Sequence, residues 1–127
     1  MTKKLISILV LLVVLIGIVT FEQVYTDDSI NRMLENVTNL EISLNDEDLE
    51  ASISKIDGII SMWDERESVI CLFVDYRDIE QIGKQADLVR SHLGNADFEL
   101  ARVECNTLER VLETFRDMVH FDVANIL

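Results

Sequence analysis

The chain has 127 residues, of which 49% are hydrophobic and 28% are charged, and it contains no proline and only four glycines. This length suits one compact domain, and the scarcity of turn-forming residues excludes a loop-rich or all-β chain. The formal net charge of −13 excludes a protein that binds nucleic acid through a basic surface. The composition therefore predicts an all-α fold built from long helices.

The first predicted element is an apolar helix over residues 5–21. At about 1.5 Å per residue it extends roughly 25 Å, close to the hydrocarbon thickness of a membrane. Cleavable secretory leaders contain a similar apolar run but end in an A-x-A-like pair of small residues, which is missing before Glu22. We therefore interpret residues 1–21 as a cytoplasmic tip and an uncleaved transmembrane signal anchor, with a cleaved leader as the alternative.

Charge on the two sides of this segment predicts its orientation. Lys3 and Lys4 precede it, and basic residues beside a membrane span are retained in the cytoplasm. All 24 acidic residues and all of the 11 basic ones except Lys3 and Lys4 lie in residues 22–127, which gives that part a formal charge of −15. The sequence thus predicts a single-pass protein of the cell membrane with an acidic extracytoplasmic domain. This charge favours basic partners or cations, or it only keeps the domain soluble.

Apolar residues spaced alternately by three and four predict four helices in this domain. The helices are expected at about residues 22–44, 46–66, 69–93 and 96–126. Their seams comprise Ile30, Met33, Val37, Leu40 and Leu44; Leu49, Ile53, Ile56, Ile60 and Trp63; Leu72, Asp75, Ile79, Ile82, Ala86, Val89 and Leu93; and Phe98, Ala101, Cys105, Leu108, Leu112, Phe115, Val119, Asp122 and Ile126. Short connections favour an antiparallel up-down-up-down bundle, and the same heptad spacing also suits a coiled coil between chains.

Capping residues predict where these helices are joined. Residues 45–48 separate the first two helices, and Gly94 is expected to end the third as a C′ glycine. The seam changes phase after the second helix, which predicts a turn or register break near residues 64–69, with one kinked continuous helix as the alternative. A shift of 49 residues aligns the first seam with the third and Asp48 with Asp97, which indicates a faint repeat of two helical hairpins.

Common catalytic and metal-binding motifs are missing from the sequence. It contains no H-E-x-x-H, C-x-x-C, Gly-rich phosphate loop or G-x-S-x-G pattern, so we expect no enzyme, no cofactor and no metal site. His92 and His120 are expected far apart, as surface residues. Cys71 and Cys105 are expected to be offset by about 20 Å along antiparallel helices, too far for a disulfide, and therefore to be free thiols.

Asp75, Tyr76 and Arg77 form a candidate polar site, because Asp75 falls on an apolar seam position. A buried carboxylate needs a partner, so Arg77, Arg102 or Arg110 is expected to pair with it in a polar layer that fixes the helix register. The functional alternative is a pocket for a cation or an amine ligand.

Three sequence blocks, together with the apolar N-terminal segment, carry a family resemblance. The blocks are Cys71-Leu72-Phe73-Val74-Asp75-Tyr76-Arg77-Asp78, Gln85-Ala86-Asp87-Leu88-Val89-Arg90 and Glu104-Cys105-Asn106-Thr107-Leu108-Glu109-Arg110. With them the whole chain resembles domain-of-unknown-function family 4363, which implies a short bacterial membrane-anchored protein of the envelope and no catalytic residues. We expect a non-enzymatic envelope protein whose bundle binds a protein partner or another copy of itself. An extracytoplasmic small-ligand or cation sensor that acts through a membrane partner is the alternative.

Overall fold

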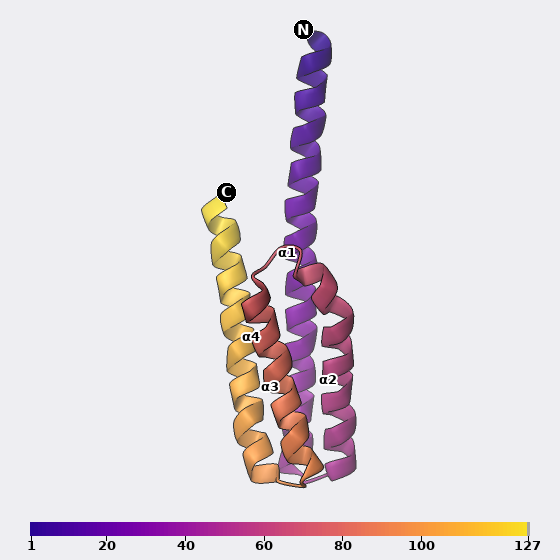
Figure 1. The fold of residues 1–127 in the computed structure, drawn as a ribbon, viewed down its shortest axis with the longest axis vertical. Coiled ribbons are helices and arrows are strands. Elements are labelled where there is room, and N and C mark those ends of the chain that lie inside the picture. Colours follow the sequence, from indigo (N-terminus) through magenta and orange to yellow (C-terminus); the bar gives the residue numbers. More distant parts are fainter. Residues whose placement is uncertain (127) are drawn as a thin grey trace.

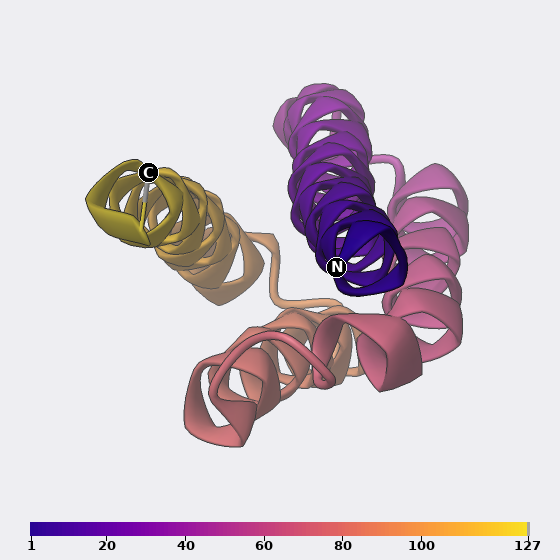
Figure 2. The same cartoon turned by 90° about the horizontal axis from the view of Figure 1, so that it is seen from above.

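The computed structural model describes the backbone of residues 1–126 and the side chains of residues 1–119. This part of the chain folds into four helices, α1 (Thr2–Asn45), α2 (Leu49–Ile70), α3 (Tyr76–Gly94) and α4 (Phe98–Ile126). Among the described residues α1 and α3 each pack against α2 and α4, and the diagonal pairs do not meet. Consecutive helices run antiparallel (Figures 1 and 2), which confirms the predicted all-α up-down-up-down bundle.

α1 is one unbroken helix that contains both the apolar segment and the first helix of the bundle. Its first part projects alone beyond the other helices (Figure 1), and the large apolar side chains from Leu5 to Ile16 are all more than half exposed. This helix is long and apolar enough to cross a membrane, as expected of a signal anchor or a signal sequence. Because no turn separates the two parts of α1, the bundle begins directly at the end of the apolar run.

The apolar core lies between the four helices and largely follows the predicted seams. All five seam residues of α1, from Ile30 to Leu44, are fully buried. The buried apolar residues of α3 are Ile79, Ile82, Ala86, Val89 and Leu93, and those of α4 are Ala101, Cys105, Leu108, Leu112, Phe115 and Val119. Removing such surface from water stabilises the bundle by about 25 cal/mol per Å². The predicted seam members Asp122 and Ile126 have side chains outside the described residues.

α2 differs from its prediction in both seam and length. Its buried residues are Ser52, Ile56, Ile59, Trp63 and Ile70, whereas Leu49, Ile53 and Ile60 are partly buried. The helix continues through residues 64–69, so the break predicted there is wrong. Arg66 explains why a break was predicted, because it occupies the core-facing position between Trp63 and Ile70. A charged residue at that position interrupts the apolar pattern without interrupting the helix.

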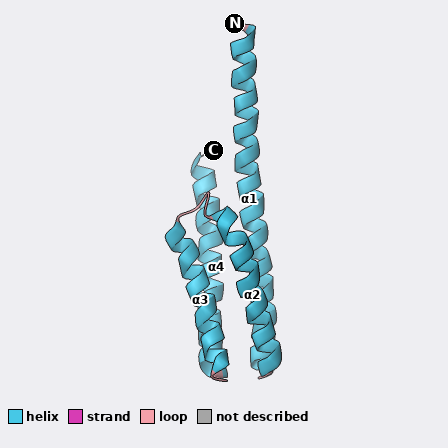
Figure 3. Cartoon of the chain, turned by 45° about the vertical axis from the view of Figure 1, so that its right-hand side comes forward, coloured by secondary structure: helices cyan, strands magenta, loops and turns pink. Residues whose placement is uncertain are grey.

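α2 and α3 are separate helices joined by a turn over residues 71–75, which we call the near-end turn. Backbone hydrogen bonds continue from α2 as far as Val74, whose N–H donates to the Ile70 carbonyl at 3.1 Å. Asp75 then starts α3 by accepting a hydrogen bond from the Arg77 N–H at 2.9 Å. Figure 3 shows this turn at the near end of the bundle, next to the projecting part of α1, with the other two turns at the far end.

The two far-end turns share one backbone conformation. Each contains a non-glycine residue with positive φ, Glu47 at 53° and Ala96 at 55°. In each, the next residue is an aspartate, Asp48 or Asp97, whose carboxylate accepts a backbone N–H of the following helix at 3.1 Å. The shift of 49 residues that aligns the predicted seams also aligns these turns, so the structure supports the internal repeat.

Gly94 does not have the role predicted for it. It is the last residue of α3 and has no positive φ. The left-handed position that usually favours glycine falls two residues later, at Ala96, because α3 continues through Gly94. The prediction of a C′ glycine at this position is therefore wrong, although the helix ends within one residue of its expected end at position 93.

Candidate functional site

The three residues predicted as a polar layer or ligand site lie at the start of α3. Asp75 and Arg77 are exposed and pair with each other, with 3.1 Å between Arg77 Nη2 and Asp75 Oδ2. The side-chain hydrogen bond from Arg77, followed by the one from its backbone N–H, holds the pKa of the Asp75 carboxyl below its usual range. The expected burial of Asp75 is wrong, because this residue is the N-cap of α3. Tyr76 is also exposed, and ligand binding by the three residues stays a prediction.

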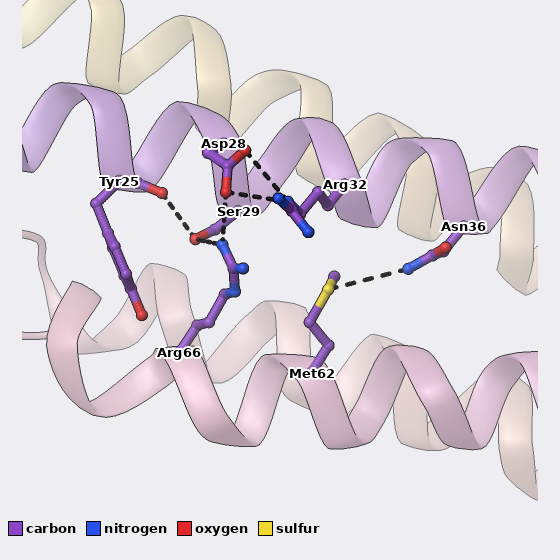
Figure 4. A network of polar contacts seen from close by, with 7 residues as sticks. All are labelled: Tyr25, Asp28, Ser29, Arg32, Asn36, Met62 and Arg66. Atoms are coloured by element: carbon purple, nitrogen blue, oxygen red, sulfur yellow. Dashed lines mark hydrogen bonds and ion pairs between the residues drawn. The ribbon is translucent and has the colours of Figure 1, made fainter.

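A polar layer does exist, but it joins α1 to α2 through Arg66 (Figure 4). Arg66 Nη1 donates to Asp28 Oδ2 at 3.0 Å and to Ser29 Oγ at 2.9 Å. The guanidinium carbon lies 5.5 Å from the centre of the Tyr25 ring, within range of a cation–π interaction. Hydrogen bonds from Arg66 and then from Arg32 hold the pKa of Asp28 below its usual range. Such a layer favours one register of the two helices near the end of the apolar segment.

Two carboxyl groups meet between α1 and α4. Burial, the hydrogen bond with Glu109 and the charge of Glu109 together raise the pKa of Glu41 to about 7. The neighbouring Cys105 thiol has a pKa raised to about 12, first by burial and then by the charges of Glu41 and Glu109. Cys105 is therefore a protonated core thiol with little reactivity. Cys105 and the exposed Cys71 are both free, as predicted.

A small cavity of about 120 Å³ adjoins this pair of carboxyl groups. It is lined by Glu41, Leu44, Asn45, Arg102 and Asn106. Arg102 Nη1 donates to the Leu44 carbonyl at 3.0 Å, and Nη2 lies 4.0 Å from the Glu47 carboxylate. Arg102 thus satisfies a carbonyl at the end of α1 and does not pair with Asp75. These contacts connect α1 to α4 at the far end of the bundle.

The outer side of α3 and α4 carries a groove. Its volume is about 300 Å³, and it is lined by Asp78, Gln81, Thr107, Arg110, Val111, Thr114, Phe115 and Met118. Towards the far end, the Gln85 amide bridges the two helices by donating to the Glu104 carbonyl oxygen at 2.9 Å and to its carboxylate at 2.7 Å. The groove therefore occupies the near-end half of this face, beyond the Gln85 bridge.

Exposed apolar side chains occupy the far-end half of the same face. Leu88 is 39% exposed, Leu100 is 45% exposed and Val103 is 53% exposed. The Gln85–Glu104 contact sets the antiparallel register, which places Leu88 and Leu100 at about the same level of their helices. We call these three residues the α3/α4 patch. Leu88 of this patch lies on α3, whose three acidic residues are balanced by three basic ones.

Side chains of the types that bind metal ions do not cluster among the described residues. Within the described part of the chain, no group of three or more His, Cys, Asp or Glu side chains has the geometry to bind a metal ion. His92 is half-buried near the end of α3, and the side chain of His120 lies outside the described residues. The Glu41–Glu109 pair and the Arg66 layer are two polar contacts between helices that sequence reasoning did not identify.

Comparison with known proteins places the chain in a family. No curated protein and no solved structure matches it. The profile of the family described as Domain of unknown function (DUF4363) matches residues 20–126, which extend from the end of the apolar run through the whole four-helix bundle. The resemblance inferred from the sequence is therefore confirmed, and the chain belongs to the DUF4363 family.

Proposed function

We propose that this chain is a non-enzymatic protein of the cell membrane whose acidic helical bundle binds another protein. Residues 5–21 remain as a single-pass anchor, with the N-terminus in the cytoplasm and residues 22–127 on the outer side. The basic residues Lys3 and Lys4 support this orientation. The unbroken α1 supports direct coupling of the bundle to the anchor, because no linker lies between them.

The α3/α4 patch is the observation that carries the proposal. A group of apolar side chains surrounded by polar ones is typical of a surface that binds a protein. The charges of α3 balance, whereas α2 carries five acidic and two basic residues and α4 carries six acidic and three basic ones. A partner of either charge therefore approaches α3 with less repulsion than an acidic partner meets at α2. We infer that the partner binds across α3 and α4.

Photocrosslinking in cells tests this proposal. A photoreactive residue placed at Leu88 or Leu100 is expected to capture one recurrent membrane or exported protein. The same residue at Ser54 or Ser61, both exposed on α2, is the matched control and is expected not to capture it. Capture of the same proteins from both faces, or crosslinks only between copies of the chain, would contradict binding of a different protein through α3 and α4.

The groove between α3 and α4 favours a second candidate function, a sensor of small charged ligands. Asp78, Gln81 and Arg110 line it, so it offers both signs of charge and hydrogen-bonding groups to a ligand. It begins one helical turn after Asp75, the predicted ligand residue. Calorimetric titration of the detergent-solubilised chain with divalent cations and small amines tests this role. Binding heat that Arg110→Ala or Asp78→Asn abolishes would support it, and no heat would contradict it.

A further inference from the structure

The near end of the bundle exposes large apolar side chains at one level. Leu72, in the near-end turn, is 75% exposed, and Tyr76, the first residue of α3, is 59% exposed. On α1, Phe21 is 55% exposed and Val24 is 63% exposed. A single exposed leucine is ordinary on a protein surface, but four large apolar side chains at one end of a small bundle are not.

Contacts between α1 and α2 fix the height of the near-end turn. Lys55 Nζ donates to the Asn39 carbonyl at 3.2 Å, and Arg66 Nη1 donates to Asp28 at 3.0 Å. Because the helices are antiparallel, Ile70 lies about opposite Val24, four residues back from Asp28. The near-end turn is therefore about level with residues 21–25 of α1, and Figure 1 shows it beside α1 at the base of the projecting part.

This height coincides with the boundary of a membrane crossed by α1. Residues 5–21 extend about 25 Å, whereas the hydrocarbon core is about 30 Å thick. Because Glu22 is charged, the boundary of the core falls between Phe21 and Val24, and the headgroup region continues for roughly 5 Å beyond it. Leu72 and Tyr76 lie within this zone. The side chains of Phe21 and Tyr25, which stack with 5.7 Å between ring centroids, lie there as well.

We propose that the near-end turn inserts Leu72 and Tyr76 into the lipid surface beside the anchor, so that the chain contacts the bilayer at two points. This inference rests on the proposed anchoring of residues 5–21. Leucine is favoured at the edge of the acyl chains, and tyrosine is favoured among the headgroups, where its hydroxyl stays hydrated. Asp75 and Arg77 neutralise each other through their ion pair at 3.1 Å, and Asp78 follows in the first turn of α3. The second contact holds the bundle in one orientation about the anchor.

The native Cys71 provides the test, because it is exposed next to Leu72 and the other cysteine, Cys105, is buried. The full chain is labelled at Cys71 with an environment-sensitive fluorophore and reconstituted into phosphatidylcholine vesicles that contain nitroxide-labelled lipids. We expect blue-shifted emission and strong quenching by the nitroxide. The same fluorophore at the far end, in Cys71→Ser with Leu100→Cys, is the matched control and is expected to emit as in water without quenching. The chain with Cys71→Ser alone measures background labelling of Cys105.

Replacing the apolar side chains separates insertion from mere proximity. Leu72→Ser with Tyr76→Ser, labelled at Cys71, is expected to lose the blue shift and most of the quenching. Both side chains are exposed, so these replacements leave the core unchanged, and the helical circular dichroism is expected to persist. Unquenched Cys71 in the native sequence, or equal quenching at Cys71 and at the far-end probe, would overturn the proposal.

A probe inside the apolar segment separates this inference from the proposed anchor. Cys71→Ser with Val13→Cys places the fluorophore in the middle of residues 5–21. Quenching at residue 13 with no quenching at Cys71 would leave the anchor intact and overturn insertion of the turn. Quenching at neither position would overturn both.

Discussion

The two ends of the bundle reverse the chain with different residues. At the far end, both turns have the same backbone, with a left-handed residue followed by a capping aspartate. At the near end, one turn exposes Leu72 and leads to Tyr76, above a polar layer around Arg66. Polar turns suit contact with water, whereas apolar and aromatic residues suit a membrane boundary. This difference matches the proposal that the near end faces a membrane and the far end faces water, although both ends connect antiparallel helices.

The largest difference in unfolding free energy is expected between replacing an apolar residue in the core and replacing one at the near end. Trp63→Ala is expected to lower the free energy of unfolding by about 3–5 kcal/mol, because it leaves a cavity at an almost fully buried position. Leu72→Ala is expected to lower it by less than about 0.5 kcal/mol, because Leu72 makes few contacts to lose. Urea unfolding of the detergent-solubilised chain, followed by circular dichroism, measures both. Equal losses would show that Leu72 is packed in the fold.

The far-end caps are expected to have the next largest effect. Asp48→Ala and Asp97→Ala each remove a hydrogen bond of 3.1 Å to the first turn of a helix. Each is expected to lower the free energy of unfolding by about 1 kcal/mol, as measured by urea unfolding. Asp46→Ala, in the same turn as Asp48, is the matched control for loss of a negative charge. If the control costs as much as Asp48→Ala, the cap is not the cause.

The Glu41–Glu109 pair predicts how stability depends on pH. Glu41 has a pKa of about 7 in the folded state against 4.5 for a glutamate in water, so the folded state binds more protons between these two values. Stability is therefore expected to fall as pH rises from 4.5 through 7, and the whole penalty is present above that interval.

Glu41→Gln tests this sign. It is expected to raise the free energy of unfolding at pH 8 by on the order of 1 kcal/mol, because partial exposure screens the repulsion that it removes. It is also expected to flatten the fall of stability with pH, in unfolding curves recorded at pH 5, 6.5 and 8. Glu35→Gln, on the exposed side of α1, is the matched control for removing one negative charge. The same flattening in both variants would contradict a specific role for Glu41.

The smallest expected effect comes from the backbone of the turns. Ala96→Gly is expected to raise the free energy of unfolding by about 0.5–1 kcal/mol, because glycine adopts a positive φ without steric cost. Glu47→Gly is expected to act in the same direction. In the near-end turn, Cys71 has a φ of −68°, so Cys71→Gly is expected to lower stability. A gain in that variant would mean that the two ends do not differ in backbone strain.

Periodicity predicts the buried face wherever core positions are all apolar. This is so for α1 from Ile30 to Leu44, because spacing reports directly which side of a helix is buried. The same reasoning fails in α2, where Ser52 and Arg66 hold core-facing positions. Whether a charged residue is tolerated there depends on partners on another helix, here Asp28 and Ser29, which the pattern of one helix does not contain.

The candidate site was harder to predict than the fold, for related reasons. Spacing alone puts Asp75 on the seam. Asp78, at the third position of α3, is a local sign that the helix starts after Asp75. The Glu41–Glu109 pair carries no local sign, since it depends on the packing of α1 against α4. Residues that cap a helix can thus be predicted from local sequence rules, whereas contacts between helices can be predicted only when the packing of the bundle is known.

Residues 5–21 are proposed to keep the chain in the membrane with the bundle outside. Labelling intact cells with a membrane-impermeant maleimide tests this placement, using Cys71→Ser with Ser54→Cys, because Ser54 is exposed on α2 and lies off the proposed binding face. We expect the probe to react without lysis and the labelled chain to resist alkaline extraction from the membrane, with residues 5–21 present in its intact mass. A soluble chain that begins near Glu22, or a membrane-bound chain labelled only after lysis, would contradict this placement.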